Sequence, residues 1–291
     1  MPFLEVDSGV RIFAQDWGRG KPAVLVHGWP FSHRMFEYQM LALAQQGYRA
    51  VALDLRGYGQ SDKPWEGNDY DSWANDLGAV MAALDLEDVT LVGFSMGGAI
   101  AMHYVATRED SRVTKLALIA AAGPCMIVGP DNPKGVPHEV FDVLIEGDLT
   151  DRAKAKRTFA QLAFHNYPYL TLLQLLYRSR SVTATATTDY HVSEELSSWF
   201  EQMGMEASPR ASVRGLEELR DRDLRQELSA IRVPTRIFHG VHDRVVPFAL
   251  GAEEQQRLID GATIVRFENS GHGVFYQEKD KLNEELIRFI D

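Results

Sequence analysis

The sequence predicts an α/β protein with a mostly parallel central sheet, helices on both faces of the sheet, and an inserted helical segment. Three observations support this fold class. Short apolar runs alternate with helical stretches over residues 1–128, helical periodicity alone fills residues 129–210, and the alternation returns over residues 211–291. Strand–helix–strand crossovers produce parallel strands, so we expect a body made of the two outer parts and a helical lid made of residues 129–210.

The first part of the body begins with a half-exposed strand. Residues 10–18 alternate apolar and polar side chains and end at glycines, which is typical of a strand with one face in water. Residues 23–26 and 49–53 are apolar at nearly every position, as expected of strands covered on both faces. Helical spacing of apolar residues predicts helices over residues 34–46 and 71–84.

Residues 89–104 predict a strand, a sharp turn and a helix in close succession, with the turn at Gly93-Phe94-Ser95-Met96-Gly97. This G-x-S-x-G pattern has the form of a nucleophile elbow, in which a serine stands on a tight strand-to-helix turn. The closely packed backbones leave no space for a Cβ atom at the two glycines. Taken alone the pattern is weak, because Gly-Ser turns are common, and its meaning depends on the remaining chain.

The rest of the chain completes the alternation after the helical segment. A strand is predicted at 113–120 and the lid carries four amphipathic helices, at 136–149, 151–164, 169–180 and 193–203. Beyond the lid we expect a linking helix at 213–228, strands at 234–238 and 263–267, a helix at 248–258 and a final amphipathic helix ending at Ile290.

Composition excludes several classes of function. The formal net charge is −11, from 30 Lys and Arg against 41 Asp and Glu, and a nucleic-acid partner requires a basic surface. Cys125 is the single cysteine, so no internal disulfide can form, and we interpret it as a small buried hydrophobe. The N-terminus has no basic and apolar signal segment and no apolar run reaches membrane-spanning length, so we expect a cytoplasmic protein with no membrane partner.

Polar residues follow three of the predicted strands. Ser95, Asp243 and His272 all stand just after apolar runs, and the carboxyl ends of parallel strands share one edge of the sheet. Serine needs a base to become nucleophilic, histidine can exchange a proton near pH 7, and a carboxylate on the far ring nitrogen orients the imidazole. The order Ser, Asp, His is that of the α/β-hydrolase triad.

Other residues compete for these roles. His103 lies inside a helix, His27 is better explained as shaping its loop, and Asp221 and Asp223 lie in a charged, exposed helix. The remaining histidines without a motif are His33, His138, His165 and His191. His239 and His242 flank Asp243 closely enough to suggest a metal site, but no further ligand cluster accompanies them, and we expect no metal.

Five motifs in order carry a resemblance to a known family. They are His27-Gly28-Trp29-Pro30, the loop 54–62, Gly93-Phe94-Ser95-Met96-Gly97-Gly98, the loop 239–247, and Gly271-His272-Gly273. The whole chain resembles an α/β hydrolase, and more closely the small bacterial arylesterases and cofactor-free haloperoxidases (perhydrolases). The resemblance covers nearly all of the body and only loosely the lid. It implies no cofactor, and Ser95 disfavours dehalogenases and epoxide hydrolases, which use aspartate at the elbow.

The resemblance also implies an oxyanion hole made by the backbone N–H groups of Trp29 and Met96. For Met96 the same follows from chemistry, because the residue after the nucleophile opens a helix whose first N–H groups are free. Substituting either side chain is not expected to remove a backbone donor. Phe31, Phe94 and Phe275, together with Trp29, suggest an apolar acyl pocket, although core packing explains any one of them equally well.

We therefore expect a serine hydrolase of the carboxylesterase or arylesterase type that acts on small, uncharged carboxylic esters through Ser95, His272 and Asp243. A lactone or lactam could replace the ester. In the resembled perhydrolases a proline often follows the tryptophan, as Pro30 follows Trp29 here, so the resemblance also implies peracid formation from a carboxylic acid and peroxide as a side activity. Activity should rise from pH 6 to about 7 as the catalytic histidine becomes neutral.

Two alternatives come from other classes. A ligand-binding receptor on a hydrolase fold would show a product burst without steady turnover. A C–C hydrolase or lyase would turn over a diketone or cyanohydrin and leave esters largely intact.

Overall fold

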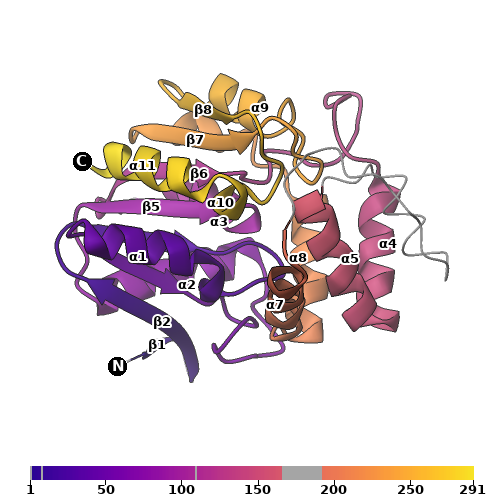
Figure 1. Ribbon diagram of the computed structural model, residues 1–291, viewed down its shortest axis with the longest axis horizontal. Coiled ribbons are helices and arrows are strands. Elements are labelled where there is room, and N and C mark those ends of the chain that lie inside the picture. The colour runs from indigo at the N-terminus through magenta and orange to yellow at the C-terminus, as the bar shows by residue number, and fades with distance from the viewer. Residues whose placement is uncertain (1, 8, 109, 166–191) are drawn as a thin grey trace.

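A twisted sheet forms the centre of the molecule (Figure 1). The computed structural model describes residues 2–7, 9–108, 110–165 and 192–291. In these residues the sheet has eight strands in the order β1-β2-β4-β3-β5-β6-β7-β8. The strands are β1 Phe3–Asp7, β2 Val10–Gly18, β3 Pro22–Val26, β4 Arg49–Leu53, β5 Val89–Phe94, β6 Val113–Ile119, β7 Thr235–Gly240 and β8 Thr263–Phe267.

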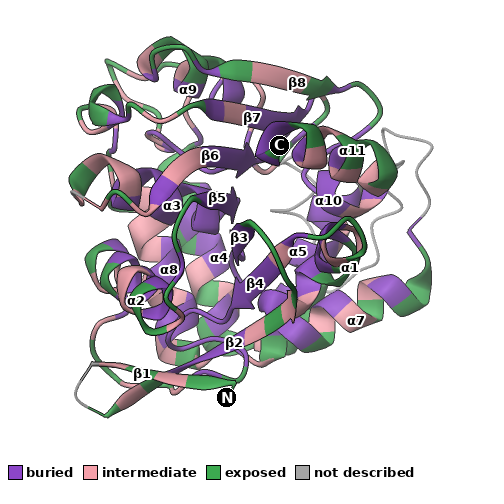
Figure 2. Ribbon diagram, turned by 90° about the vertical axis from the view of Figure 1, so that its left-hand side faces the viewer, coloured by how far each residue is buried: buried purple, intermediate pink, exposed green. Residues whose placement is uncertain are grey.

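The sheet is parallel from β4 to β8 and antiparallel only at one edge, where β2 pairs with β1 and β4. The predicted α/β class with a mostly parallel sheet is therefore confirmed. Strands β3 and β5 are buried at every position, as their unbroken apolar runs indicated (Figure 2). Strand β1 was not predicted, because its short, mixed sequence has no clear period and gains its hydrogen bonds only from β2.

Helices cover both faces of the sheet (Figure 2). Helices α1 (Glu37–Gln45) and α11 (Lys279–Ile290) pack together on one face. Helices α2 (Tyr70–Ala83) and α3 (Met96–Thr107) pack on the other. The bounds of the shorter elements are η1 His33–Phe36, η2 Leu228–Ala230, α9 Ala252–Leu258 and α10 Val274–Gln277. The helix predicted at 34–46 thus divides into a 3₁₀ turn and an α-helix.

Four helices gather at the end of the sheet toward which β5 and β7 point (Figure 1). They are α4 His138–Thr150, α5 Arg152–His165, α7 Glu194–Met205 and α8 Pro209–Asp221. The helix predicted at 169–180 lies outside the described residues. Within the described ranges, every helix is too short or too polar to span a lipid bilayer.

Helix α8 begins four residues earlier than the helix predicted at 213–228 and ends seven residues earlier. The side chain of Ser208 caps it by accepting the Ala211 N–H, and Pro209 follows as the first helical residue, a favoured start signal that the prediction overlooked. Helix α8 therefore crosses the predicted lid boundary at 210, and it packs against α4 of the lid.

The turn between β5 and α3 depends on glycine. A Cβ atom on Gly93 would lie 2.5 Å from the carbonyl oxygen of Gly97, and one on Gly97 would overlap the carbonyl oxygens of Val26 and His27. The first turn of α3 therefore lies directly against the end of β3. This contact brings the loop after β3 next to Ser95.

We predict that Gly97→Ala lowers the free energy of unfolding by about 3 kcal/mol or more, because the backbone of β3 must move to admit the methyl group. Gly129→Ala is the matched control, since a Cβ atom there meets nothing within 4 Å. Urea unfolding of both variants checks this. Equal stability of the two variants would show that the elbow is loosely packed.

Candidate active site

Ser95 occupies the turn between β5 and α3 with a backbone φ of 51° and ψ of −119°. A positive φ is rare for a residue with a side chain and persists only where the surroundings hold it. Here the Ser95 N–H donates to the Ile119 carbonyl at 3.1 Å, and the Ser95 carbonyl accepts the N–H groups of Gly98 and Ala122, both at 2.9 Å. These bonds to α3 and to the β6 segment fix the backbone on which the hydroxyl stands.

The structure brings the three residues of the predicted triad together. Ser95 Oγ lies 3.0 Å from His272 Nε2, and His272 Nδ1 lies 2.8 Å from Asp243 Oδ2. Asp243 follows β7, His272 follows β8, and all three side chains are buried. The convergence of strand ends therefore places a hydroxyl, an imidazole and a carboxylate in one hydrogen-bonded chain, the arrangement that nucleophilic catalysis by serine requires.

The two oxygens of Asp243 have different partners. Oδ1 accepts the backbone N–H groups of Val245 and Val246, each at 2.8 Å, which leaves Oδ2 for His272. Burial favours the neutral acid, but the electrostatic interaction with His272 and hydrogen bonds from His239 and His272 outweigh it and hold the pKa of Asp243 below its ordinary value. An ionised carboxylate only accepts, so His272 donates its Nδ1–H and presents Nε2 as the acceptor for the Ser95 hydroxyl.

The two backbone N–H groups predicted for the oxyanion hole belong to segments that meet near Ser95. Met96 is the first residue of α3, and Trp29 lines the same cavity as Ser95. Within the described part of the chain, neither the Met96 N–H nor the Trp29 N–H has a hydrogen-bond acceptor. This is the arrangement that an oxyanion hole requires.

The loop that carries Trp29 is fixed by a neutral histidine. His27 Nδ1 donates to the Gly28 carbonyl at 3.0 Å and His27 Nε2 accepts the Leu55 N–H at 3.1 Å. Burial lowers the pKa of His27 to about 4, so the ring stays neutral. A Cβ atom on Gly28 would lie 2.8 Å from the Cβ atom of Ser95. These contacts agree with the interpretation that His27 shapes its loop.

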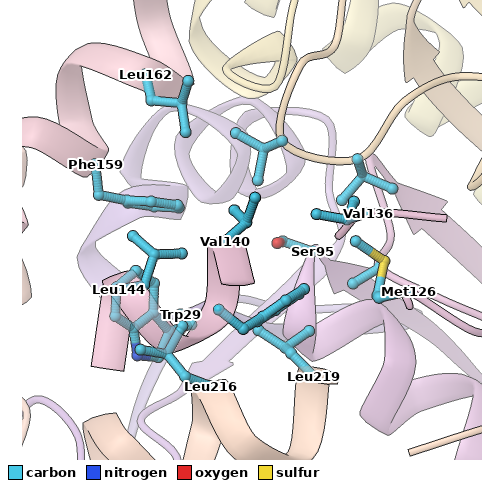
Figure 3. A pocket seen from close by; sticks show the side chains of 14 residues that line it. Trp29, Ser95, Met126, Val136, Val140, Leu144, Phe159, Leu162, Leu216 and Leu219 are labelled. Atoms are coloured by element: carbon cyan, nitrogen blue, oxygen red, sulfur yellow. The ribbon is translucent and has the colours of Figure 1, made fainter. Parts of the chain in front are cut away.

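Ser95 opens into an apolar cavity between the body and the helices of the lid (Figure 3). The space not filled by atoms measures about 520 Å³, including the opening to solvent. Ser95 contributes the only hydroxyl among the described residues that line it. The other lining residues include Met126, Val140, Leu144, Phe159, Leu162, Leu216 and Leu219.

Sequence reasoning missed most of this lining. Leu144 and Phe159 lie on amphipathic helices α4 and α5, whose periodicity marks one apolar face. That signal identifies side chains that are buried, but it does not say whether they face the cavity or another helix.

The sequence predicts that Phe31, Phe94 and Phe275 line an acyl pocket. The structure corrects this prediction, because none of the three is part of the cavity lining among the described residues. They pack into an aromatic cluster: ring centroids are 4.8 Å apart for Phe94 and Phe275, and 5.0 Å apart for Phe31 and Phe200. Phe94 also lies 4.9 Å from the ring of His272. Edge-to-face contacts with one another and with Phe200 hold these rings behind the triad, where they support His272.

The two histidines beside Asp243 lie in different environments. His239 Nε2 donates to the Val246 carbonyl at 2.9 Å and lies 3.3 Å from Asp243 Oδ2, and His242 is exposed. Among the described residues, no group of three or more His, Cys, Asp or Glu side chains is arranged to hold a metal ion. His239 instead adds a second donor near the carboxylate.

The rival residues lie in other environments. Asp221 and Asp223 form ion pairs with Arg220 and Arg225 at the surface. His103 lies within α3, with its ring nitrogens 3.0 Å from Asp71 and 2.7 Å from Glu227. None of these groups is part of the cavity lining among the described residues.

Comparison with known proteins gives consistent similarities over the whole chain. A family model described as "alpha/beta hydrolase fold" matches residues 21–279. A protein of Bacillus subtilis described as an AB hydrolase superfamily protein is 42% identical over 287 residues, which are 99% of this chain and 98% of the relative. A non-heme haloperoxidase of Rhodococcus erythropolis is 36% identical over 293 residues and 100% of both chains.

A solved structure is similar to the same extent. An esterase from Exiguobacterium antarcticum superposes with a TM-score of 0.88 at 36% sequence identity, and the match covers 99% of this chain and 98% of the esterase. The similarity in fold therefore includes the strand ends on which Ser95, Asp243 and His272 stand.

The neutral state of His27 predicts a pH dependence of stability. The pKa is about 4 in the folded protein and 6.5 in the unfolded chain, so the unfolded chain takes up the proton first as the pH falls. The contribution is fully present above pH 6.5 and is lost between pH 6.5 and 4, and the loss amounts to about 2 kcal/mol at pH 5.

Urea unfolding at pH 7 and pH 5 tests this against His27→Gln, whose side chain takes no proton in that range. The wild type should lose about 2 kcal/mol more than the variant between the two pH values. An identical loss in both proteins would mean that His27 is not held neutral.

Proposed function

Because this chain belongs to the α/β-hydrolase fold family, we propose that it is a serine hydrolase that cleaves small, uncharged carboxylic esters. The observation that carries the proposal is the chain of hydrogen bonds from Asp243 through His272 to Ser95, which ends at an apolar cavity. The haloperoxidase and esterase similarities support the same class.

The first half of the reaction forms an acyl-enzyme. Ser95 Oγ attacks the ester carbonyl while its proton passes to His272 Nε2, and Asp243 stabilises the imidazolium that results. The carbonyl oxygen becomes an oxyanion, which accepts hydrogen bonds from the Trp29 and Met96 N–H groups. One such donor contributes about 3 kcal/mol to transition-state stability. His272 then returns the proton to the leaving alcohol.

The second half releases the acid. Water takes the place of the alcohol, His272 removes its proton, and the hydroxyl attacks the acyl carbonyl of Ser95. Collapse of the second tetrahedral intermediate frees the carboxylic acid and restores the Ser95 hydroxyl.

The cavity favours an uncharged substrate. Its lining is aliphatic and aromatic apart from Ser95, and a charged group placed there would lose its hydration without gaining a partner. A lactone or lactam of similar polarity would fit the same chemistry, because ring opening proceeds through the same acyl-enzyme.

Peracid formation is a proposed side activity. If hydrogen peroxide replaces water in the second step, the acyl group leaves as a peracid. The first step releases an alcohol when the acyl donor is an ester and water when it is a carboxylic acid. The Trp29-Pro30 sequence and the similarity to a protein named as a haloperoxidase support this activity.

Two other functions of the same site would give different kinetic results. A ligand-binding receptor with an intact triad would release one equivalent of product and then stop. A C–C hydrolase would turn over diketones rapidly and esters slowly. A panel of esters, lactones, lactams and a diketone assayed with purified protein separates these outcomes.

We predict that Ser95→Ala lowers kcat for p-nitrophenyl acetate by at least about a thousandfold, because no other hydroxyl lines the cavity among the described residues. Ser229→Ala is the control, since this serine is exposed and lies outside the described lining of the cavity. If Ser95→Ala retains most of the activity, the assignment fails.

Asp243→Asn should lower kcat by about 10³ to 10⁴-fold while the protein stays folded. The amide can keep one oxygen for the Val245 and Val246 N–H groups, but it then turns an N–H₂ toward His272 Nδ1 and favours the tautomer that cannot accept the Ser95 proton. Steady-state kinetics and circular dichroism check the two parts. Near-normal kcat would exclude Asp243 as the orienting carboxylate.

A further inference from the structure

A buried ion pair lies among the lid helices next to the proposed oxyanion hole. Lys156 of α5 pairs with Asp148 of α4, and neither side chain is exposed to solvent. Lys156 Nζ also donates to Ser212 Oγ of α8 at 2.7 Å. One ammonium group therefore joins three helices of the lid.

This cluster holds the side chain of Trp29. The indole Nε1–H donates to the carbonyl oxygen of Ser212 at 2.9 Å and to its hydroxyl at 3.1 Å. Lys156 Nζ lies 4.3 Å from the centroid of the indole, within the range of a cation–π interaction. The ring of Phe159 packs edge-on against the indole at 4.7 Å. All of these contacts come from α5 and α8, although Trp29 belongs to the loop after β3.

Helix α8 also limits how the oxyanion residues can move. A Cβ atom on Gly215 would lie 3.1 Å from Trp29 Cδ1, 3.1 Å from Met96 Sδ and 2.5 Å from the Tyr58 hydroxyl. The glycine thus lets α8 press against the side chains of both proposed oxyanion donors, with no space left for another carbon.

Stability alone does not account for charges at this place. A buried ion pair loses hydration on folding, and apolar residues of similar size often replace such pairs at no cost. Burial lowers the pKa of Lys156 to about 8, against the opposing effect of Asp148, and Arg152 lowers it further. A charged pair in this position is therefore better explained by what it orients.

We propose that Lys156, Asp148 and Ser212 form a positioning network that anchors the Trp29 indole, aims the Trp29 backbone N–H at the oxyanion, and so links the lid to the rate of the chemical step. The inference rests on the proposed function, because the oxyanion arises only in acyl transfer. These residues do not touch the substrate; they act through Trp29. The donor is a backbone group, yet its direction depends on where its side chain is held.

The test compares two variants. Lys156→Met leaves Asp148 buried and unpaired, so Tm should fall by about 5–10 °C together with kcat. Lys156→Met combined with Asp148→Leu removes both charges. We expect this double variant to recover Tm to near the wild-type value while kcat for p-nitrophenyl acetate stays at least about tenfold lower and KM changes less than about threefold.

A second readout follows the oxyanion itself. Ser95 Oγ adds to the carbonyl carbon of an aryl trifluoromethyl ketone, and the serine proton passes to His272. The ketone oxygen then remains as an oxyanion bound to the enzyme. The inhibition constant of the ketone should rise in the double variant by about the same factor as kcat falls. Lys115→Met is the control, because Lys115 contacts the Phe289 ring and the carbonyls of Phe289 and Ile290 on the body, and should change neither quantity.

A double variant with wild-type kcat and inhibition constant would overturn the inference and leave the pair as a structural contact. If the double variant does not fold, Trp29→Phe replaces it, since phenylalanine keeps the ring and the backbone donor but loses the bond to Ser212. It should lower kcat about tenfold, and unchanged kcat would overturn the inference. Ser95→Ala in parallel separates the proposals, because its retained activity would contradict the proposed function itself.

Discussion

The close approach of α3 to the end of β3 is the constraint on which the site depends. Gly97 lies against the carbonyls of Val26 and His27, so the first turn of α3 meets the loop that follows β3. Ser95, which has a positive φ, therefore lies next to the loop after β3, where a Cβ atom on Gly28 would be 2.8 Å from the Ser95 Cβ atom. In the proposed reaction, the Ser95 hydroxyl and the two backbone N–H donors would all be held by this one contact between backbones. Donors that are fixed in advance stabilise the oxyanion without rearranging.

The body and the lid make different contributions. The strand ends of the body supply Ser95, Asp243 and His272, which determine the kind of bond that can be broken. Helices α4, α5 and α8 supply most of the apolar wall, which selects the molecule. The network from Lys156 through Ser212 to Trp29 adds a second role for the lid, because it connects the wall to the geometry of a catalytic donor.

The sequence predicted the parts of the structure that follow from local periodicity. Unbroken apolar runs identified the buried strands. The positions of Ser95, Asp243 and His272 after such runs predicted that the three side chains lie together, because parallel strand ends converge. Periodicity cannot say which neighbour a buried ring meets, so Phe94 was assigned to the pocket and lies in an aromatic cluster. The role of Lys156 was overlooked for a related reason. Its position three residues before Phe159 puts it on the apolar face of α5, and this spacing was a signal that a charged side chain was buried there.

The central claim is that Ser95 becomes acylated, and a covalent probe tests it most directly. Purified protein is treated with a p-nitrophenyl alkylphosphonate, which transfers its phosphonyl group to an activated serine and releases p-nitrophenol. Mass spectrometry of the intact chain and of its peptides should find one phosphonyl group per chain, on the peptide that contains Ser95. A label on another residue, or none at all under conditions of ester turnover, would contradict it.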